Sequence, residues 1–109
     1  MSVVFALFLL LLPLLANPSH AAEKKKADEG TVALNRGISD LNLGNDRAAI
    51  QAFSKAIRLN PKLAEAYGRR GDVYDKLGEH ERAIIDIKVA ARLGYRPARK
   101  VLKDMGIAW

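Results

Sequence analysis

The sequence contains no cysteine and very little histidine. Disulfides, thiolate chemistry and zinc sites built on sulfur are therefore excluded, and so is a lipid-modified bacterial lipoprotein. His80 is the only histidine after residue 22, and a lone histidine without acid or cysteine spacing around it does not predict a metal or catalytic site. We therefore expect no enzymatic activity, no metal and no cofactor.

Charged side chains are missing from the first 22 positions, because no Asp or Glu precedes Glu23 and the first basic residue is Lys24. An apolar run from Val3 to Ala16 fills most of this segment. Its length is typical of the apolar region of a signal peptide and is shorter than the ~20 residues that a membrane-spanning helix needs. The segment therefore predicts export of the chain.

The residues after the apolar run predict where the segment is cut. Ser19 and Ala21 fit the small-x-small preference of signal peptidase, so we expect a signal peptide over residues 1–21, with a cut after Ala22 as the alternative. The mature protein would then be secreted or periplasmic.

Three lysines directly after the run leave a second interpretation open. Residues 24–26 are all lysine, and the positive-inside rule prefers such residues on the cytoplasmic side of a membrane. The run would then stay as a membrane anchor, with the domain in the cytoplasm. Pro13 and the pair Asn17-Pro18 interrupt a spanning helix, which favours cleavage.

No stretch has the alternation of a β-strand, and apolar residues recur instead at the three- and four-residue spacing of helices. A mobile charged leader is expected over residues 22–29, before a first helix that begins near Asp28 to Thr31 and ends near Asn42. Further helices are expected over residues 46–60, 62–77, 81–93 and 98–105. Gly44 is placed for the left-handed conformation at a helix end, and we expect Gly78 to turn the chain again.

The segment from Asp46 to Pro61 recurs in part thirty-four residues later, which is the strongest signal in the chain. Its start and stop residues and its single apolar stripe predict one amphipathic helix. The identities at this shift are Arg36/Arg70, Gly37/Gly71, Leu43/Leu77, Gly44/Gly78, Ala49/Ala83, Ile50/Ile84, Ala56/Ala90, Arg58/Arg92 and Leu59/Leu93. Small residues mark close helix approaches, so we expect Gly37 to meet Ala49 and Ala56, and Gly71 to meet Ala83 and Ala90.

This period and these residues resemble the tetratricopeptide repeat family. The second copy matches better, with Tyr67, Gly71, Tyr74, Ala83, Ile87 and Ala90 at family positions, whereas Ala33 and Asp40 replace the two aromatic residues in the first. The resemblance implies an all-α solenoid of two repeats, over residues 30–63 and 64–97, closed by a capping helix and tail over residues 98–109. Arg36 and Arg70 stand at a normally apolar position, where their stems can pack while their charges reach water.

The resemblance also implies a concave groove that binds a partner protein or peptide, without catalysis. We call its implied lining the groove face: Thr31, Leu34, Asn35, Ile38 and Leu41 in the first repeat, and Glu65, Gly68, Arg69, Asp72, Asp75 and Lys76 in the second. Two repeats are fewer than usual for a stable stack, so self-association or completion by a partner is expected.

Two parts of the groove face allow more than one interpretation. Leu34, Ile38 and Leu41 form an apolar stripe, which is either a partner-binding or dimerising patch or part of the core. The charges on the second half, from Arg69 to Lys76, either hold a peptide or form ordinary pairs on a solvated helix face. The same charges argue against a catalytic pair of Asp72 and Asp75.

A cluster of basic residues near the C-terminus gives a further candidate surface: Arg92, Arg96, Arg99, Lys100 and Lys103. It predicts contact with an anionic partner, or else it only keeps the cap soluble. Nucleic acid is not expected, because no aromatic residues are interleaved with the basic ones. A structural or accessory subunit of a larger envelope complex is the alternative to an adaptor.

Overall fold

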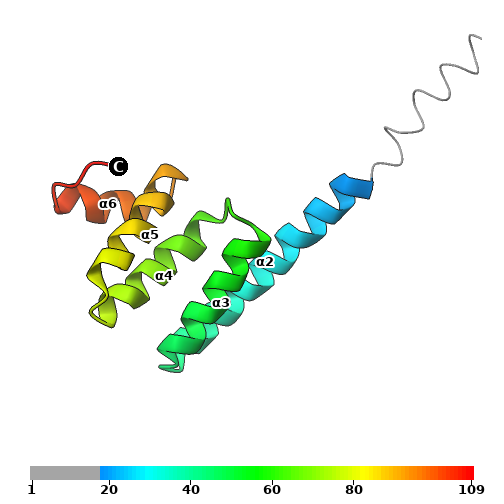
Figure 1. Ribbon diagram of the computed structural model, residues 1–109, viewed down its shortest axis with the longest axis horizontal. Helices are drawn as coiled ribbons and strands as arrows, with labels where there is room; N and C mark the ends of the chain where they lie inside the picture. The colour runs from blue at the N-terminus through cyan, green and yellow to red at the C-terminus, as the bar shows by residue number, and fades with distance from the viewer. Residues whose placement is uncertain (1–17) are drawn as a thin grey trace, which may run out of the picture.

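The computed structural model describes residues 18–109, which form helices joined by short turns, with no strand in this range (Figure 1). The helices are α2 (Pro18–Asn42), α3 (Asp46–Leu59), α4 (Ala64–Lys76), α5 (His80–Arg92) and α6 (Arg96–Asp104). α2 pairs with α3 and α4 with α5, while α3 contacts α4 and α5 contacts α6. The predicted all-α solenoid of two helical pairs and a terminal helix is confirmed. Most of the predicted signal peptide lies outside the described residues.

The turn inside each helical pair has the same geometry. Gly44 has a positive φ of 78°, as the sequence predicts, and Gly78, where a turn is predicted, has a positive φ of 81°. In each turn the next residue donates its N–H to a carbonyl five positions earlier: Asn45 to Asp40 at 2.9 Å and Glu79 to Tyr74 at 2.8 Å. The two turns are therefore copies of one structure, as the thirty-four-residue period requires.

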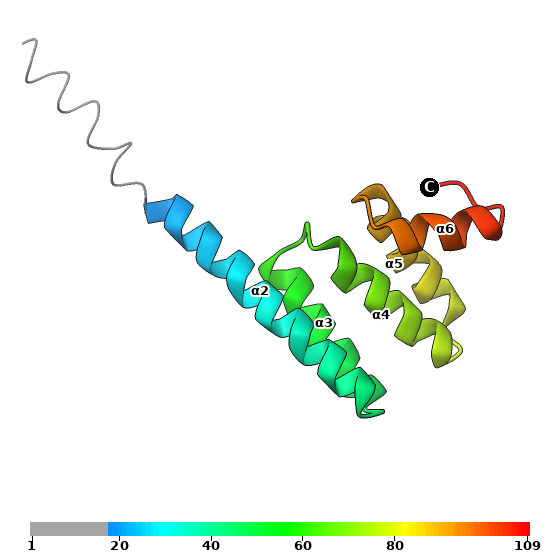
Figure 2. The same ribbon diagram turned by 180° about the vertical axis from the view of Figure 1, so that it is seen from behind.

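The first helix is much longer than the sequence indicates. We expected it to begin near Asp28 to Thr31 after a mobile leader, which is wrong: α2 is continuous from Pro18. The added part contains Ala, Glu and Lys, which are strong helix formers, and extending an existing helix adds a hydrogen bond for each residue fixed. None of residues 19–29 is buried. Figures 1 and 2 show this part of α2 extending away from the other helices.

The remaining helix ends lie within three residues of their predicted positions. Pro97 lies in the first turn of α6, as predicted. Within the described residues no helix is long and apolar enough to cross a membrane.

The core consists of two apolar clusters. The first joins α2, α3 and α4 around Phe53, and the second joins α5 and α6 around Leu102; both side chains are fully buried. Gly71 contacts Ala83 as predicted, because a β-carbon at Gly71 would lie 3.1 Å from the Ala83 carbonyl oxygen, but its nearest neighbour is Ile87, at 2.9 Å, and not the predicted Ala90. At Gly37 the nearest neighbour is instead the ring of Phe53, 2.5 Å from a β-carbon built there.

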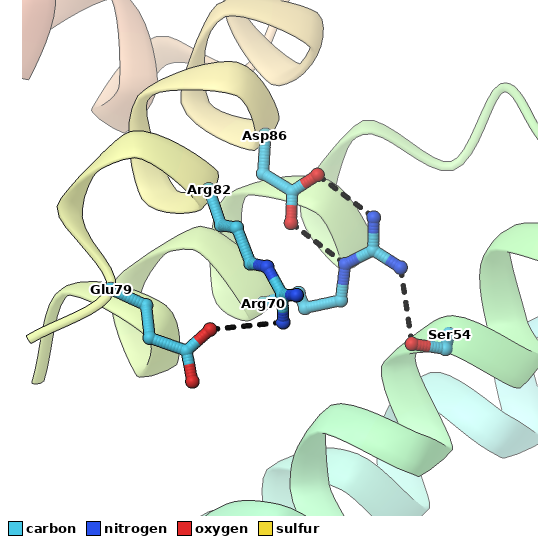
Figure 3. Close-up of polar contacts among 5 residues, drawn as sticks. All are labelled: Ser54, Arg70, Glu79, Arg82 and Asp86. Carbon is cyan, nitrogen blue, oxygen red and sulfur yellow. Dashed lines mark hydrogen bonds and ion pairs between the residues drawn. The ribbon is translucent and has the colours of Figure 1, made fainter. Parts of the chain in front are cut away.

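A polar cluster joins the two repeats (Figure 3). The Arg70 guanidinium donates two hydrogen bonds to Asp86 on α5, at 2.7 and 2.8 Å, and a third to the Ser54 hydroxyl on α3, at 3.0 Å. The hydrogen bond to Asp86 raises the pKa of Arg70 above its ordinary value, against the opposing effect of burial. Arg70 thus contacts α5, the second helix of its own repeat, and α3, the second helix of the preceding repeat.

The prediction that both repeat arginines reach water is therefore half right. The Arg36 side chain is 78% exposed, whereas that of Arg70 is only 20% exposed. The reason lies at the position of Asp86, which is Ala52 in the first repeat and offers no carboxylate. Tyr74 also lies beside the Arg70 charge, with the guanidinium carbon 5.8 Å from its ring centre.

Candidate functional site

The first half of the groove face lies on α2 and is partly core. Leu34 is only 5% exposed, and Ile38 and Leu41 pack half-buried against the first apolar cluster. Of the two interpretations of this stripe, packing in the core is what the structure shows. Thr31 and Asn35 are exposed on the same helix, so α2 offers polar rather than apolar contacts here.

The second half of the groove face lies on α4, and most of its charges are paired. Arg69 donates two hydrogen bonds to the Glu65 carboxylate, at 3.0 and 3.1 Å. Lys76 reaches Asp46 at the start of α3, with 3.1 Å between its Nζ and the carboxylate. Only the first of these pairs is the ordinary (i, i+4) contact within one helix that the sequence suggests.

Asp75 and Asp72 differ in their partners. The Asp75 carboxylate lies 2.7 Å from His80 Nδ1, so this histidine does have a nearby acid, contrary to the sequence-based expectation. Asp72 forms no hydrogen bond or ion pair among the residues that the structure describes. Asp72 is exposed overall, but partial desolvation by the neighbouring side chains raises its pKa; Arg69 counteracts the shift, and Asp75 adds to it.

Asp72 lies at the edge of a small cleft formed by α4, α5, α6 and the turn before α6. The cleft has a volume of about 70 Å³, and besides Asp72 it is lined by Gly68, Ile87, Tyr95, Pro97, Ala98 and Val101. A β-carbon at Gly68 would lie 2.5 Å from the Tyr95 ring, so only glycine leaves room for this aromatic side chain. Burial in turn raises the pKa of the Tyr95 hydroxyl.

Tyr95 and this cleft were not predicted from the sequence. By the thirty-four-residue shift Tyr95 stands where the first repeat has Pro61, and this difference is the one signal that could have drawn attention to it. Its contact with Gly68 joins residues far apart in the chain, so no local pattern reveals it. The result is an acidic group beside an apolar cleft, an arrangement able to accept a hydrogen bond from a ligand whose small side chain enters the cleft.

The basic residues near the C-terminus are all exposed. Lys100 pairs with Asp104 at 2.7 Å, and this hydrogen bond raises the pKa of Lys100. Arg99 donates to the Ala91 carbonyl oxygen at 2.8 Å, which ties α6 to α5. In the described part of the chain, Arg92, Arg96 and Lys103 form no ion pair. No group of His, Asp and Glu in this part could hold a metal ion.

Comparison with known proteins identifies the class to which these helical pairs belong. Residues 40–84 match the family model described as TPR repeat. The chain is also 34% identical over 68 residues to small glutamine-rich tetratricopeptide repeat-containing protein 2 of Mycosarcoma maydis, which covers 62% of this chain and 18% of that protein. The resemblance to the tetratricopeptide repeat family seen in the sequence is confirmed over residues 40–84.

A second similarity is to a bacterial protein. The chain is 32% identical over 80 residues to cellulose synthase operon protein C of Escherichia coli strain K12, covering 72% of this chain and 7% of that protein. The chain thus spans less than a fifth of the length of either relative. Tetratricopeptide repeats generally mediate interactions between proteins and are typically non-enzymatic scaffolds.

Proposed function

We propose that this chain is a protein-binding adaptor without enzymatic activity, and that its ligand is a protein segment held on the groove face of α2 and α4. The observation that carries this proposal is Asp72, an acid without a hydrogen-bond partner in the described chain, beside the cleft below Tyr95. A bound segment donates a backbone or side-chain N–H to this carboxylate. Such a bond to a charged acceptor contributes about 1.5–3 kcal/mol where water is excluded, and less at an exposed carboxylate such as Asp72.

The neighbouring groups orient the segment. Arg69 is already held by Glu65, so its guanidinium keeps a fixed position, and donors left over from that contact can bind a carbonyl oxygen. Asn35 on α2 supplies both a donor and an acceptor in its amide. The apolar cleft takes one small side chain, because 70 Å³ leaves no room for a large one. We therefore expect a ligand with a small apolar residue next to a polar one.

The proposal is tested by affinity co-purification of the tagged full-length chain from its own cells. The double variant Asn35→Glu with Asp72→Lys adds a negative charge to the groove face on α2 and reverses the charge of Asp72 on α4. Glu81→Lys reverses an exposed charge on α5 and is the matched control. We expect a stoichiometric protein with the wild type and the control, and its loss with the groove variant. Equal recovery by all three proteins would contradict binding through this face.

We also propose that the chain is exported, on the strength of its apolar first segment and the small residues before Ala22. The measurement is the intact mass of the protein taken from the envelope fraction. A chain that begins at Ala22 or Glu23 is the expected result. An uncleaved chain held in the membrane would favour the anchored cytoplasmic alternative and move the search for the partner to the cytoplasm.

Contact of the basic residues at the C-terminal end with an anionic surface stays a prediction. The unpaired groups Arg92, Arg96 and Lys103 support it. Such contact would be weak alone and would fall with salt, because exposed charges are screened over about 10 Å at moderate ionic strength.

A further inference from the structure

The projecting part of α2 has no counterpart in the second repeat. By the thirty-four-residue shift, the start of α4 at Ala64 corresponds to Gly30, yet α2 begins at Pro18. The extra residues, 18–29, extend the helix by about 18 Å. We call residues 22–29, which remain after the proposed cleavage that follows Ala21, the arm.

Beside α2 lies an open groove between α2 and α3, with a volume of about 700 Å³. It is on the flank that carries Arg36, the equivalent of Arg70, and it is distinct from the groove face. In the second repeat that flank is covered by the contact of Arg70 with Ser54 on α3, while in the first repeat it is open. Val32 lies in the groove lining and is 69% exposed.

A single stripe of residues joins the arm to this groove. Counted along α2, Lys25, Glu29, Val32, Arg36 and Asp40 follow one another at steps of four, three, four and four, so they share one face of the helix. All but Lys25 line the groove. We call these five residues the α2 stripe.

The charged side chains of the stripe form only one long ion pair within the described part of the chain. Arg36 and Asp40 lie 3.9 Å apart, the longest ion pair in the described structure, and neither Lys25 nor Glu29 forms one there. The order is also unfavourable, because a basic residue four positions before an acidic one stabilises a helix less than the reverse. Ion pairs within α2 therefore do not account for this arrangement of charged side chains.

The same order suits a second copy of the stripe. Read from its N-terminal end it is basic, acidic, apolar, basic, acidic, so reversing its direction places each charge opposite its complement. With two α2 helices antiparallel, Glu29 of each copy faces Arg36 of the other, and Lys25 faces Asp40. The exposed Val32 side chains of the two copies meet at the centre. The pairs at the two ends of the stripe enclose about 23 Å of helix.

We propose that the chain forms a symmetric dimer in which the α2 stripes of two copies pack antiparallel, each arm covering the groove of the other copy. Val32 and the apolar lining of the groove supply the affinity, and the charge pairs fix the direction and register. This surface is separate from the groove face, so dimerisation leaves the proposed ligand site open.

A cysteine cross-link tests the centre of the interface, because the full-length chain has no cysteine of its own. With Val32→Cys we expect a disulfide-linked pair of chains after mild oxidation of a cell lysate. The matched control is Asn35→Cys, which is exposed on the same helix but on its groove face. Equal cross-linking of the two variants would overturn the proposal, and so would a disulfide between the thiol introduced by Val32→Cys and a different protein.

Charge reversal then tests the register. Glu29→Arg and Arg36→Glu, each combined with Val32→Cys, place like charges opposite each other in a pair of identical chains, so we expect cross-linking to fall at least tenfold. A mixture of the two variants restores both complementary contacts and should recover the cross-link. Glu81→Arg changes an exposed charge on α5, outside the arm and the stripe, and should leave the yield unchanged. If the mixture does not recover the cross-link, the antiparallel arrangement is refuted. Loss of the groove-face ligand in the co-purification experiment tests the proposed function and does not contradict the dimer.

Discussion

The ion pair of Arg70 and Asp86 is the residue-scale contact on which the repeat junction most depends. Both side chains are largely buried, so removing the carboxylate leaves a guanidinium without its partner. For Asp86→Ala we expect the free energy of unfolding to fall by roughly 2–4 kcal/mol, measured by urea denaturation. The network cannot be inferred from sequence, because the two residues lie on different helices and no local spacing connects them.

A matched control for this change is Glu79→Ala. Its partner Arg82 lies at a similar distance, 3.0 Å, but the pair is exposed (Figure 3). Exposed pairs contribute little, so a loss within about 0.5 kcal/mol is expected. Equal losses for the two variants would show that the buried pair does not stabilise the junction.

Asp72 predicts a pH dependence of stability. Its pKa is raised in the folded chain, so between the unfolded value, near 3.8, and the folded one the native state binds more protons. The contribution of this group to stability is therefore present below the unfolded pKa and is lost as pH rises through the folded pKa. Asp72→Asn removes that loss, so its melting temperature relative to wild type should rise from pH 3 to pH 7.

The control for this pH profile is Asp28→Asn, on the exposed arm of α2. Its melting temperature relative to wild type should not change over the same range. A profile for Asp72→Asn that also stays flat would mean that the cleft does not perturb this carboxyl group. Tyr95 would then not desolvate the Asp72 carboxyl group enough to change its pKa.

At the scale of elements, α6 is the cap that closes the second apolar cluster. Leu102 is fully buried in it, while its neighbour Val101 is 39% exposed. We expect Leu102→Ala to lower the free energy of unfolding by about 2–5 kcal/mol, through lost burial and the cavity it leaves. The adjacent change Val101→Ala should cost much less in the same denaturation experiment. Similar costs would contradict a capping role for α6.

The elements also show where prediction from sequence succeeds. The helices, their turns and the repeat follow from periodic apolar residues and from glycines such as Gly44 and Gly78, which are local signals. The start of α2 was wrong because its arm has no apolar stripe and forms by extension of a neighbouring helix. Leu34 could not be assigned to core or surface, since that depends on how α2, α3 and α4 pack together.

For the whole molecule, the two helical pairs give two different surfaces. The groove face on α2 and α4 combines the paired charges of Arg69 and Glu65 with the unpaired Asp72 and a small cleft. The opposite flank of α2 carries the self-complementary stripe. A dimer through the stripe would present two groove faces, and ligands with two binding segments would then bind more tightly than single segments do.

The measurement that tests binding on the groove face most directly is site-specific photo-cross-linking in living cells. A benzophenone amino acid replaces Asn35 on the groove face or, as the control, Ile85, which is 63% exposed on α5. We predict one discrete adduct of a different protein at position 35 and none at position 85. Adducts at both positions, or at neither, would contradict a protein-binding site on this face.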